Sequence, residues 1–249
     1  MTAGLLVVGG GIAGCEAAFA AARAGTDTVL VTTSLDTLYV MAHGARELRP
    51  PPGSLMAACL GGAERAAANG ARLRREAKRL LEREPRLHLL QSTVSELLVE
   101  EGVVVGAGTW EGPVIRASRV ALCVGSFLGA RLRVGASVEH AGRLSEMAYD
   151  DLRDDLVRRG FALRPERLAL DGAGGALPYT VHFDVLTAAE VGEGRHAAPR
   201  LAGLYAAGAC LGRFGYEACA SDGMALAAAV LGAGDGAQSG RAAPGALLL

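Results

Sequence analysis

The sequence predicts an α/β fold built on a mostly parallel sheet, and three observations support this prediction. The 249 residues are 51% hydrophobic and only 20% charged, which is too apolar for a disordered chain. Apolar runs typical of buried strands alternate with stretches of helical composition. A glycine-rich turn directly follows the first of these runs. The runs lie at 5–8, 28–31, 87–91, 120–124 and 204–207.

The first apolar run leads into the pattern G-x-G-x-x-G at Gly9, Gly11 and Gly14, and a stretch of helical composition follows over 12–24. In a strand–turn–helix–strand setting each glycine has a separate task. Gly9 permits the tight turn, Gly11 leaves room for a diphosphate beside the main chain, and Gly14 lets the helix pack closely on the sheet. The free N–H groups and the positive dipole end of the helix, near Ile12, stabilise phosphate charge. The sequence therefore predicts a dinucleotide site.

The acidic residue that usually accepts the adenosine ribose hydroxyls, about 20 residues further on, is absent. The second strand ends instead at Thr32, followed by Thr33 and Ser34. A threonine hydroxyl binds a ribose hydroxyl more weakly than a carboxylate does. Thr32 is equally well explained as an ordinary β-branched strand residue. No arginine stands beside it to receive a 2′-phosphate, so the sequence does not favour NADP.

The remaining elements follow from composition and from glycine and proline positions. We expect one domain over 1–231 and a disordered tail over 232–249. Within the domain we predict a helical stretch over 54–84 broken near its glycines, a β-meander over about 94–116, a charged helix at 150–159, and a last helix from about 218 to 231. Loops are expected at 45–53, 170–175 and 190–199.

Composition also argues against several classes of function. The formal net charge of −1 and the 4% aromatic content argue against a nucleic-acid partner. The five cysteines form no C-x-x-C pair and the histidines show no zinc spacing, so we expect neither a disulfide framework nor a metal site. The apolar start over 4–22 lacks a basic region and carries Glu16, so we expect a cytoplasmic protein without a membrane segment.

Several spaced motifs together resemble the glucose-inhibited division protein A (GidA) family. Residues 7–18 and the segment T-T-S-L-D-T at 32–37 are similar to the family's opening, which also has a threonine in place of the acidic ribose ligand. Segments that resemble the middle and the last part of the family lie at 103–106, 121–128, 142–146, 203–208 and 215–218. Family members are FAD-dependent enzymes that modify the wobble uridine of tRNA. The resemblance implies an FAD/NAD(P)-binding Rossmann-like domain of the glutathione-reductase type, with FAD as cofactor.

The resemblance also assigns residues to parts of FAD. Gly125 and Ser126 would lie near the adenosine and the diphosphate, and the backbone of Val94 would meet the adenine. The turn after the last strand would approach the diphosphate and the ribityl chain, and the last helix would point its N-terminus at the flavin. The full set expected to bind FAD is Gly9, Gly10, Gly11, Ile12, Ala13, Gly14, Thr32, Thr33, Ser34, Val94, Gly125, Ser126, Gly208, Ala209, Gly215, Tyr216, Glu217 and Ala218.

The sequence departs from the family in length and in one loop. Members carry an inserted nicotinamide-binding domain and a C-terminal helical tRNA-binding domain, whereas about forty residues separate Leu163 from Gly203 here. The family's thiol loop reads V-M-A-H-G at 40–44, where His43 is either a loop residue or a group near the flavin. We therefore interpret the chain as a short paralogue reduced to the FAD domain, and tRNA modification by this chain alone is the least favoured hypothesis.

Two hypotheses on function remain open. The first is an FAD-dependent oxidoreductase whose small-molecule electron donor and acceptor the sequence does not identify. The second is a flavin-binding module without turnover of its own, acting with a protein partner or as a homo-oligomer. No catalytic residue is assigned. Packing explains Cys210 and Cys219 better than a redox role does, and a solvated helix face explains the mixed charges of 72–86 better than an RNA-binding patch does. Glu217 is explained equally by helix capping and by a role at the flavin or substrate.

Overall fold

A computed structural model describes residues 2–41, 47–67, 69–170, 177–191 and 196–238. Its centre is a five-stranded parallel sheet with the strand order β16-β9-β1-β2-β5. The predicted parallel sheet is therefore confirmed, and each strand lies in a predicted run except that β2 continues one residue further, to Thr32. The strands are β1 (Leu5–Val8), β2 (Thr28–Thr32), β5 (Leu87–Gln91), β9 (Val120–Leu122) and β16 (Leu204–Ala206).

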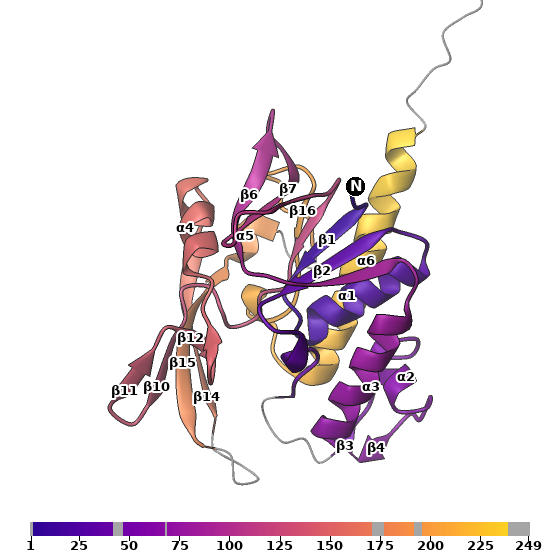
Figure 1. Ribbon diagram of the computed structural model, residues 1–249, viewed down its shortest axis with the longest axis vertical. Helices are drawn as coiled ribbons and strands as arrows, with labels where there is room; N and C mark the ends of the chain where they lie inside the picture. The colour runs from indigo at the N-terminus through magenta and orange to yellow at the C-terminus, as the bar shows by residue number, and fades with distance from the viewer. Residues whose placement is uncertain (1, 42–46, 68, 171–176, 192–195, 239–249) are drawn as a thin grey trace, which may run out of the picture.

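Strand β1 is buried on both faces, and each face meets a different layer. Leu5 and Val7 belong to the core that α1 (Ile12–Arg23) and α6 (Tyr216–Gln238) cover, whereas Leu6 and Val8 belong to the core beneath the β-meander. This division follows from the alternation of side chains along a strand. The two helices lie side by side in Figure 1.

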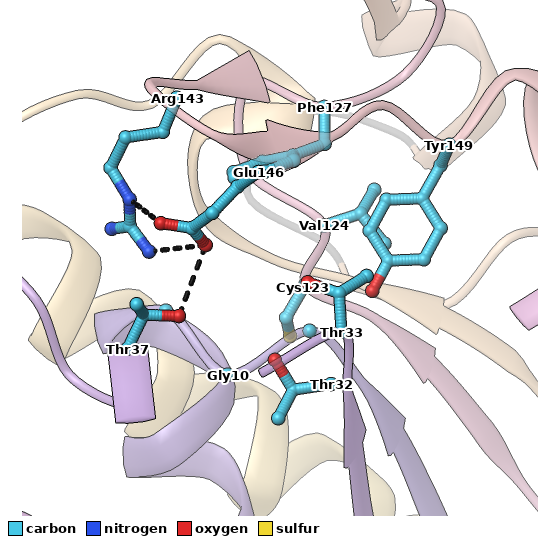
Figure 2. A pocket seen from close by; sticks show the side chains of 13 residues that line it. Gly10, Thr32, Thr33, Thr37, Cys123, Val124, Phe127, Arg143, Glu146 and Tyr149 are labelled. Carbon is cyan, nitrogen blue, oxygen red and sulfur yellow. Dashed lines mark hydrogen bonds and ion pairs between the residues drawn. The ribbon is translucent and has the colours of Figure 1, made fainter. Parts of the chain in front are cut away.

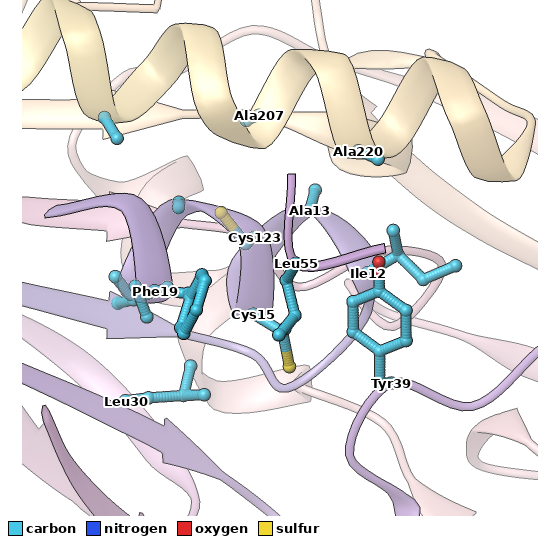
Figure 3. Close-up of a cluster of buried hydrophobic side chains, with 14 of the residues drawn as sticks. Ile12, Ala13, Cys15, Phe19, Leu30, Tyr39, Leu55, Cys123, Ala207 and Ala220 are labelled. Carbon is cyan, nitrogen blue, oxygen red and sulfur yellow. The ribbon is translucent and has the colours of Figure 1, made fainter. Parts of the chain in front are cut away.

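The contact between α1 and α6 is made by small side chains. Ala13 of α1 and Ala220 of α6 are both buried and lie between the two helices in Figure 3. A Cβ added to Gly223 would overlap the carbonyl oxygen of Ala13. Glycine and alanine therefore bring the backbones of the first and last helices together.

The segment between β2 and β5 holds short elements and one longer helix. Ser54 caps α2, its hydroxyl accepting a hydrogen bond from the N–H of Ala57 at 2.9 Å. The helical stretch is broken near its glycines, as predicted. The elements are η1 (Leu35–Thr37), β3 (Glu47–Leu48), α2 (Leu55–Cys59), β4 (Ala66–Ala67) and α3 (Gly70–Arg83).

The β-meander is confirmed as a three-stranded antiparallel sheet, formed by β6 (Val94–Glu100), β7 (Val103–Thr109) and β8 (Val114–Arg116). The charged helix α4 (Asp150–Arg158) packs against β6. The carboxylate of Asp155, on the buried side of α4, accepts a hydrogen bond from the N–H of Leu97 at 3.0 Å. This contact fixes α4 to the meander.

A second sheet, which the sequence analysis did not predict, lies beside α4 and away from α3 (Figure 1). Its four antiparallel strands follow the order β11-β10-β15-β14. The strands are β10 (Arg131–Val134), β11 (Ser137–Glu139), β14 (Leu163–Leu170) and β15 (Tyr179–Leu186). A small hairpin of β12 (Ala141–Arg143) and β13 (Glu146–Met147) comes between them in the chain.

Four predicted boundaries require correction. Strand β3 (Glu47–Leu48) lies within the loop predicted at 45–53. Helix α6 starts at Tyr216 and continues to Gln238, seven residues past the predicted end and into the stretch expected to be disordered. A helix-interior glycine costs only about 1 kcal/mol, so Gly232 does not stop an alanine-rich helix. Leu170 belongs to β14 rather than to a loop, and α5 (Ala188–Val191) occupies the start of another predicted loop. Residues 239–249 lie outside the described part of the chain.

Candidate functional site

The turn between β1 and α1 has the geometry that the glycine pattern predicts. Gly9 has φ of +109°, and a Cβ on Gly14 would overlap the carbonyl oxygen of Gly9. Both glycines are therefore required by the fold itself. Gly11 differs, because its φ is −72° and a Cβ added there would meet nothing within 4 Å. The protein leaves open space beside the main chain at Gly11.

The N-terminus of α1 opens at this same turn. Gly11 is the N-cap residue, it provides no side-chain hydrogen bond to the helix, and the first turn contains no acidic residue. The first N–H groups of a helix have no partner within the helix. A phosphate placed at Gly11 would accept hydrogen bonds from these groups and would be stabilised by the helix dipole.

A pocket lies directly over this turn (Figure 2). The structure brings six of the predicted residues into its wall, including Thr32 and Gly125. Seven further residues of the wall were missed by the sequence analysis. The predicted members are Gly9, Gly10, Gly11, Thr32, Thr33 and Gly125, and the missed members are Thr37, Cys123, Val124, Phe127, Arg143, Glu146 and Tyr149.

The missed polar residues of the pocket form one hydrogen-bonded group. The guanidinium of Arg143 donates to both carboxylate oxygens of Glu146, with Nη2 at 2.7 Å from Oε2. The hydroxyl of Thr37 donates to the same Oε2 at 3.0 Å (Figure 2). The side chains of Arg143 and Glu146 are only 19% and 12% exposed, so this ion pair is largely shielded from solvent. Sequence proximity offers no signal for the contact between Thr37 and Glu146, which are 109 residues apart.

An aromatic pair completes another part of the wall. The rings of Phe127 and Tyr149 meet edge to face, with centroids 6.2 Å apart. Burial raises the pKa of the Tyr149 phenol above its usual value. The phenol is therefore neutral at physiological pH, and this side of the pocket carries no charge from it.

Predicted residues outside the pocket wall have other roles in the structure. Ser34 caps η1, accepting from the N–H of Asp36 at 3.2 Å, and the hydroxyl of Ser126 donates to the carbonyl of Gly142 at 3.0 Å. Val94 is buried at the start of β6 and lines a separate hollow, although Tyr149 borders both. The structure therefore does not bring Val94 into the pocket at the glycine turn.

The residues expected near the flavin gather around η3 (Gly208–Leu211) and the start of α6. A Cβ on Gly208 would lie 2.8 Å from the Cβ of Ala13, so this turn sits against the first turn of α1. Ala209 is in η3, Gly215 precedes α6, and Tyr216 and Ala218 are in its first turn. Glu217 accepts a hydrogen bond from the N–H of Arg49 at 3.2 Å. His43 lies outside the described residues.

The five cysteines are free thiols in the structure. Burial raises the pKa of Cys59 and Cys210 to about 12 and that of Cys219 to about 11, and it also raises those of Cys15 and Cys123. All five are therefore protonated at neutral pH, and none is an activated thiolate. Within the described ranges, no group of three His, Cys, Asp or Glu residues could hold a metal ion, and no helix has the length and apolarity to span a bilayer.

The charged face of α3 is a solvated helix surface rather than a bare basic patch. Arg79 pairs with Glu76 one turn away, and Arg86, beyond the helix, pairs with Asp27 at 2.7 Å. Lys78 pairs with Asp36 at 3.2 Å. Acidic partners thus accompany Lys78, Arg79 and Arg86 on this surface.

Comparisons with known proteins agree with this geometry. The sequence model of "Glucose inhibited division protein A" matches residues 4–44 and 59–168. The GidA-related protein from Thermus thermophilus is 38% identical, with a TM-score of 0.84 over 94% of this chain and 100% of that chain. GidA from Aquifex aeolicus is 18% identical, with a TM-score of 0.82 over 93% of this chain, which spans 64% of the length of that protein.

More distant structures share the fold. THI4 from Thermovibrio ammonificans is 13% identical, with a TM-score of 0.60 over 94% of this chain and 90% of that chain. Together these matches confirm the predicted α/β fold. The match to the family model and to the GidA-related protein agrees with the expectation of FAD as the cofactor. The glycine turn and the open space at Gly11 fit the diphosphate of that cofactor.

Proposed function

The chain belongs to the glucose-inhibited division protein A family. From this premise we propose that it is a flavoprotein that holds FAD over the β1–α1 turn. We propose further that it acts as an FAD-dependent oxidoreductase on a small-molecule substrate. The main support for this proposal is the space around the three glycines of the turn. Gly9 and Gly14 are glycines because the protein's own backbone fills the space around them, whereas Gly11 borders open space. In a turn between a strand and a helix, a glycine that the fold itself does not need leaves room for a diphosphate beside the main chain.

The residues of the chain bind and orient the cofactor in this proposal. The first N–H groups of α1 hold the diphosphate, and the pocket wall at Thr32, Thr33 and Gly125 receives the adenosine side. Gly208 and α6 lie against the first turn of α1, where the ribityl chain and the flavin would pass. FAD, when bound, supplies two-electron redox chemistry. The positive end of the α6 dipole favours an anionic ring placed there.

The thiols of the chain take no part in the proposed chemistry. All five have raised pKa values and are protonated at neutral pH. Electrons would therefore pass between the flavin and its small-molecule donor and acceptor without a cysteine relay. A second candidate function is a flavin-binding module that has no turnover of its own and serves a partner subunit.

Anaerobic stopped-flow absorbance of the purified protein distinguishes the two candidates. We expect a yellow protein whose flavin absorbance is bleached by NADH or NADPH. Unchanged absorbance with both nucleotides, together with bleaching by dithionite, would favour the flavin-binding module. A colourless protein that takes up no added FAD would contradict both candidates.

A further inference from the structure

The adenosine ribose poses a specific problem in this chain, because the end of β2 offers hydroxyls where such sites usually offer a carboxylate. We propose that Glu146, from the β12–β13 hairpin, supplies this carboxylate. It accepts a hydrogen bond from a ribose hydroxyl in the adenosine half of the cofactor. This inference rests on the proposed function, because it assigns a residue within the same site.

The position of Glu146 supports the assignment. Its carboxylate bonds to Thr37 in η1, and η1 follows β2 after two residues. Glu146, Thr37 and Thr32 all line the pocket that contains Gly9 and Gly11 (Figure 2). A distant segment thus places a carboxylate beside the end of β2, in the pocket where a local acidic residue is missing.

The hydrogen bonds of Glu146 leave it able to bind a ligand. A carboxylate has about four acceptor positions. Oε2 accepts from Arg143 and from Thr37, whereas Oε1 accepts from Arg143 only, among the residues that the structure describes. One acceptor position on Oε1 therefore remains for a ribose hydroxyl, and the bidentate arginine fixes the orientation of the carboxylate.

Arg143 also allows a carboxylate to lie close to the negatively charged diphosphate. A lone carboxylate next to a diphosphate would repel it, and shielding from solvent would increase that repulsion. Arg143 offsets the charge of Glu146 within the pocket wall, so the pair presents a hydroxyl acceptor without net negative charge. A 2′-phosphate in place of the 2′-hydroxyl has no proton to donate to the Glu146 carboxylate, so adenosine 2′,5′-bisphosphate should bind more weakly than ADP if the 2′-hydroxyl is the group that Glu146 binds.

The experiment measures dissociation constants by isothermal titration calorimetry on the flavin-free protein. The ligands are ADP, 2′-deoxy-ADP, 3′-deoxy-ADP and adenosine 2′,5′-bisphosphate, and FMN serves as the ligand without an adenosine. For the wild type we expect at least one deoxy analogue to bind about 10- to 100-fold more weakly than ADP, the range of a hydrogen bond to a charged group. Wild type that binds ADP and both deoxy analogues equally would overturn the proposal.

Two variants of Glu146 extend the test, and one variant elsewhere is the matched control. Glu146→Ala should bind ADP as weakly as wild type binds the deoxy analogue, and it should no longer distinguish the two ligands. Glu146→Gln keeps a neutral acceptor and should lose about tenfold in ADP affinity. FMN binding should be unchanged in both. Glu76→Ala removes the same kind of arginine–glutamate pair from α3, outside the pocket, and should bind ADP like the wild type.

The outcomes separate the inference from the proposed function. A wild-type protein that binds neither FAD nor ADP would contradict the proposed function itself. A protein that binds both, and whose Glu146 variants keep full affinity and full discrimination, would overturn only the role of Glu146. If Glu146→Ala does not fold by circular dichroism, the Glu146→Gln variant and the wild-type analogue series decide the question without it.

Discussion

The carboxylate of Asp222 in α6 accepts a hydrogen bond from the backbone N–H of Gly208 at 2.6 Å. Its other oxygen pairs with the guanidinium of Arg213, and the residue is 9% exposed. Gly208 has φ of +81° and begins the turn that lies against the first turn of α1. One buried carboxylate therefore connects the last helix to the turn after β16, in the part of the site where we place the flavin.

Replacing Asp222 with alanine should destabilise the protein. The variant leaves the N–H of Gly208 without its acceptor and Arg213 without its counter-charge, and the expected loss is about 1–3 kcal/mol in the free energy of unfolding. Urea denaturation followed by circular dichroism measures it. Asp222→Asn retains a carbonyl oxygen for the N–H of Gly208 and should lose less. An alanine variant with wild-type stability would show that the contact contributes little.

Replacing Gly11 with valine should abolish FAD retention and leave the fold intact. A side chain at this position meets nothing in the protein, so it occupies only the space that we assign to the diphosphate. The flavin absorbance per mole of purified protein and the thermal unfolding midpoint together check the prediction.

The control for Gly11 is Gly14→Ala. Its Cβ would overlap the carbonyl oxygen of Gly9, so this smaller substitution should lower the unfolding midpoint itself. A Gly11→Val protein that co-purifies with stoichiometric FAD would show that the diphosphate lies elsewhere.

The parallel sheet and the glycine turn could be predicted because their signals are local. Strand β1, the glycines and α1 are consecutive in the chain, and strands buried on both faces form continuous apolar runs. The second sheet gave no such signal. Strand β10 alternates Arg131 and Arg133 with apolar residues, a period-two pattern typical of a half-buried strand that the sequence analysis overlooked. Strand β14 contains Pro165, which normally argues against a strand.

The candidate site could be predicted at the glycine pattern, at the end of β2 and, through the family resemblance, at Gly125. Gly9, Gly10 and Gly11 were found from their spacing, and Thr32 from its place at the end of a strand. Arg143 and Glu146 reach the pocket from a hairpin more than a hundred residues further on, through contacts that only the folded chain makes. The missing acidic residue after β2 was the one local sign that a distant group had to be sought.

The stability of the protein should depend on pH through Glu16. This side chain is buried in α1 and accepts hydrogen bonds from the Tyr39 hydroxyl at 2.5 Å and from the N–H of Leu55 at 2.7 Å. Burial is the main reason that its pKa is raised above 4.5 in the folded state, and the hydrogen bond from Tyr39 partly opposes this. The folded state therefore holds the proton more tightly than the unfolded chain does.

The sign of this effect follows from proton linkage. The contribution of Glu16 to stability is full below the unfolded-state pKa and decreases as the pH rises from there through the folded-state pKa. Glu16→Gln does not titrate, so the stability difference between wild type and variant should shift in favour of the variant from pH 4 to pH 7. Urea denaturation of both proteins across this range measures the difference. A difference that stays constant with pH would contradict the raised pKa.

The close approach of α6 to α1 should be sensitive to a single methyl group. In Gly223→Ala the new Cβ would overlap the carbonyl oxygen of Ala13, so the helices must separate and the free energy of unfolding should fall by about 1–3 kcal/mol. Gly232 is in the same helix, and a Cβ there meets nothing within 4 Å. Gly232→Ala should therefore raise stability by about 0.5–1 kcal/mol, since alanine favours a helix over glycine. Both substitutions add one methyl group to the same helix. We nevertheless expect urea denaturation to show changes of opposite sign in the free energy of unfolding, because only Gly223 lies against α1. A stabilising effect from both would show that α6 does not depend on close contact with α1.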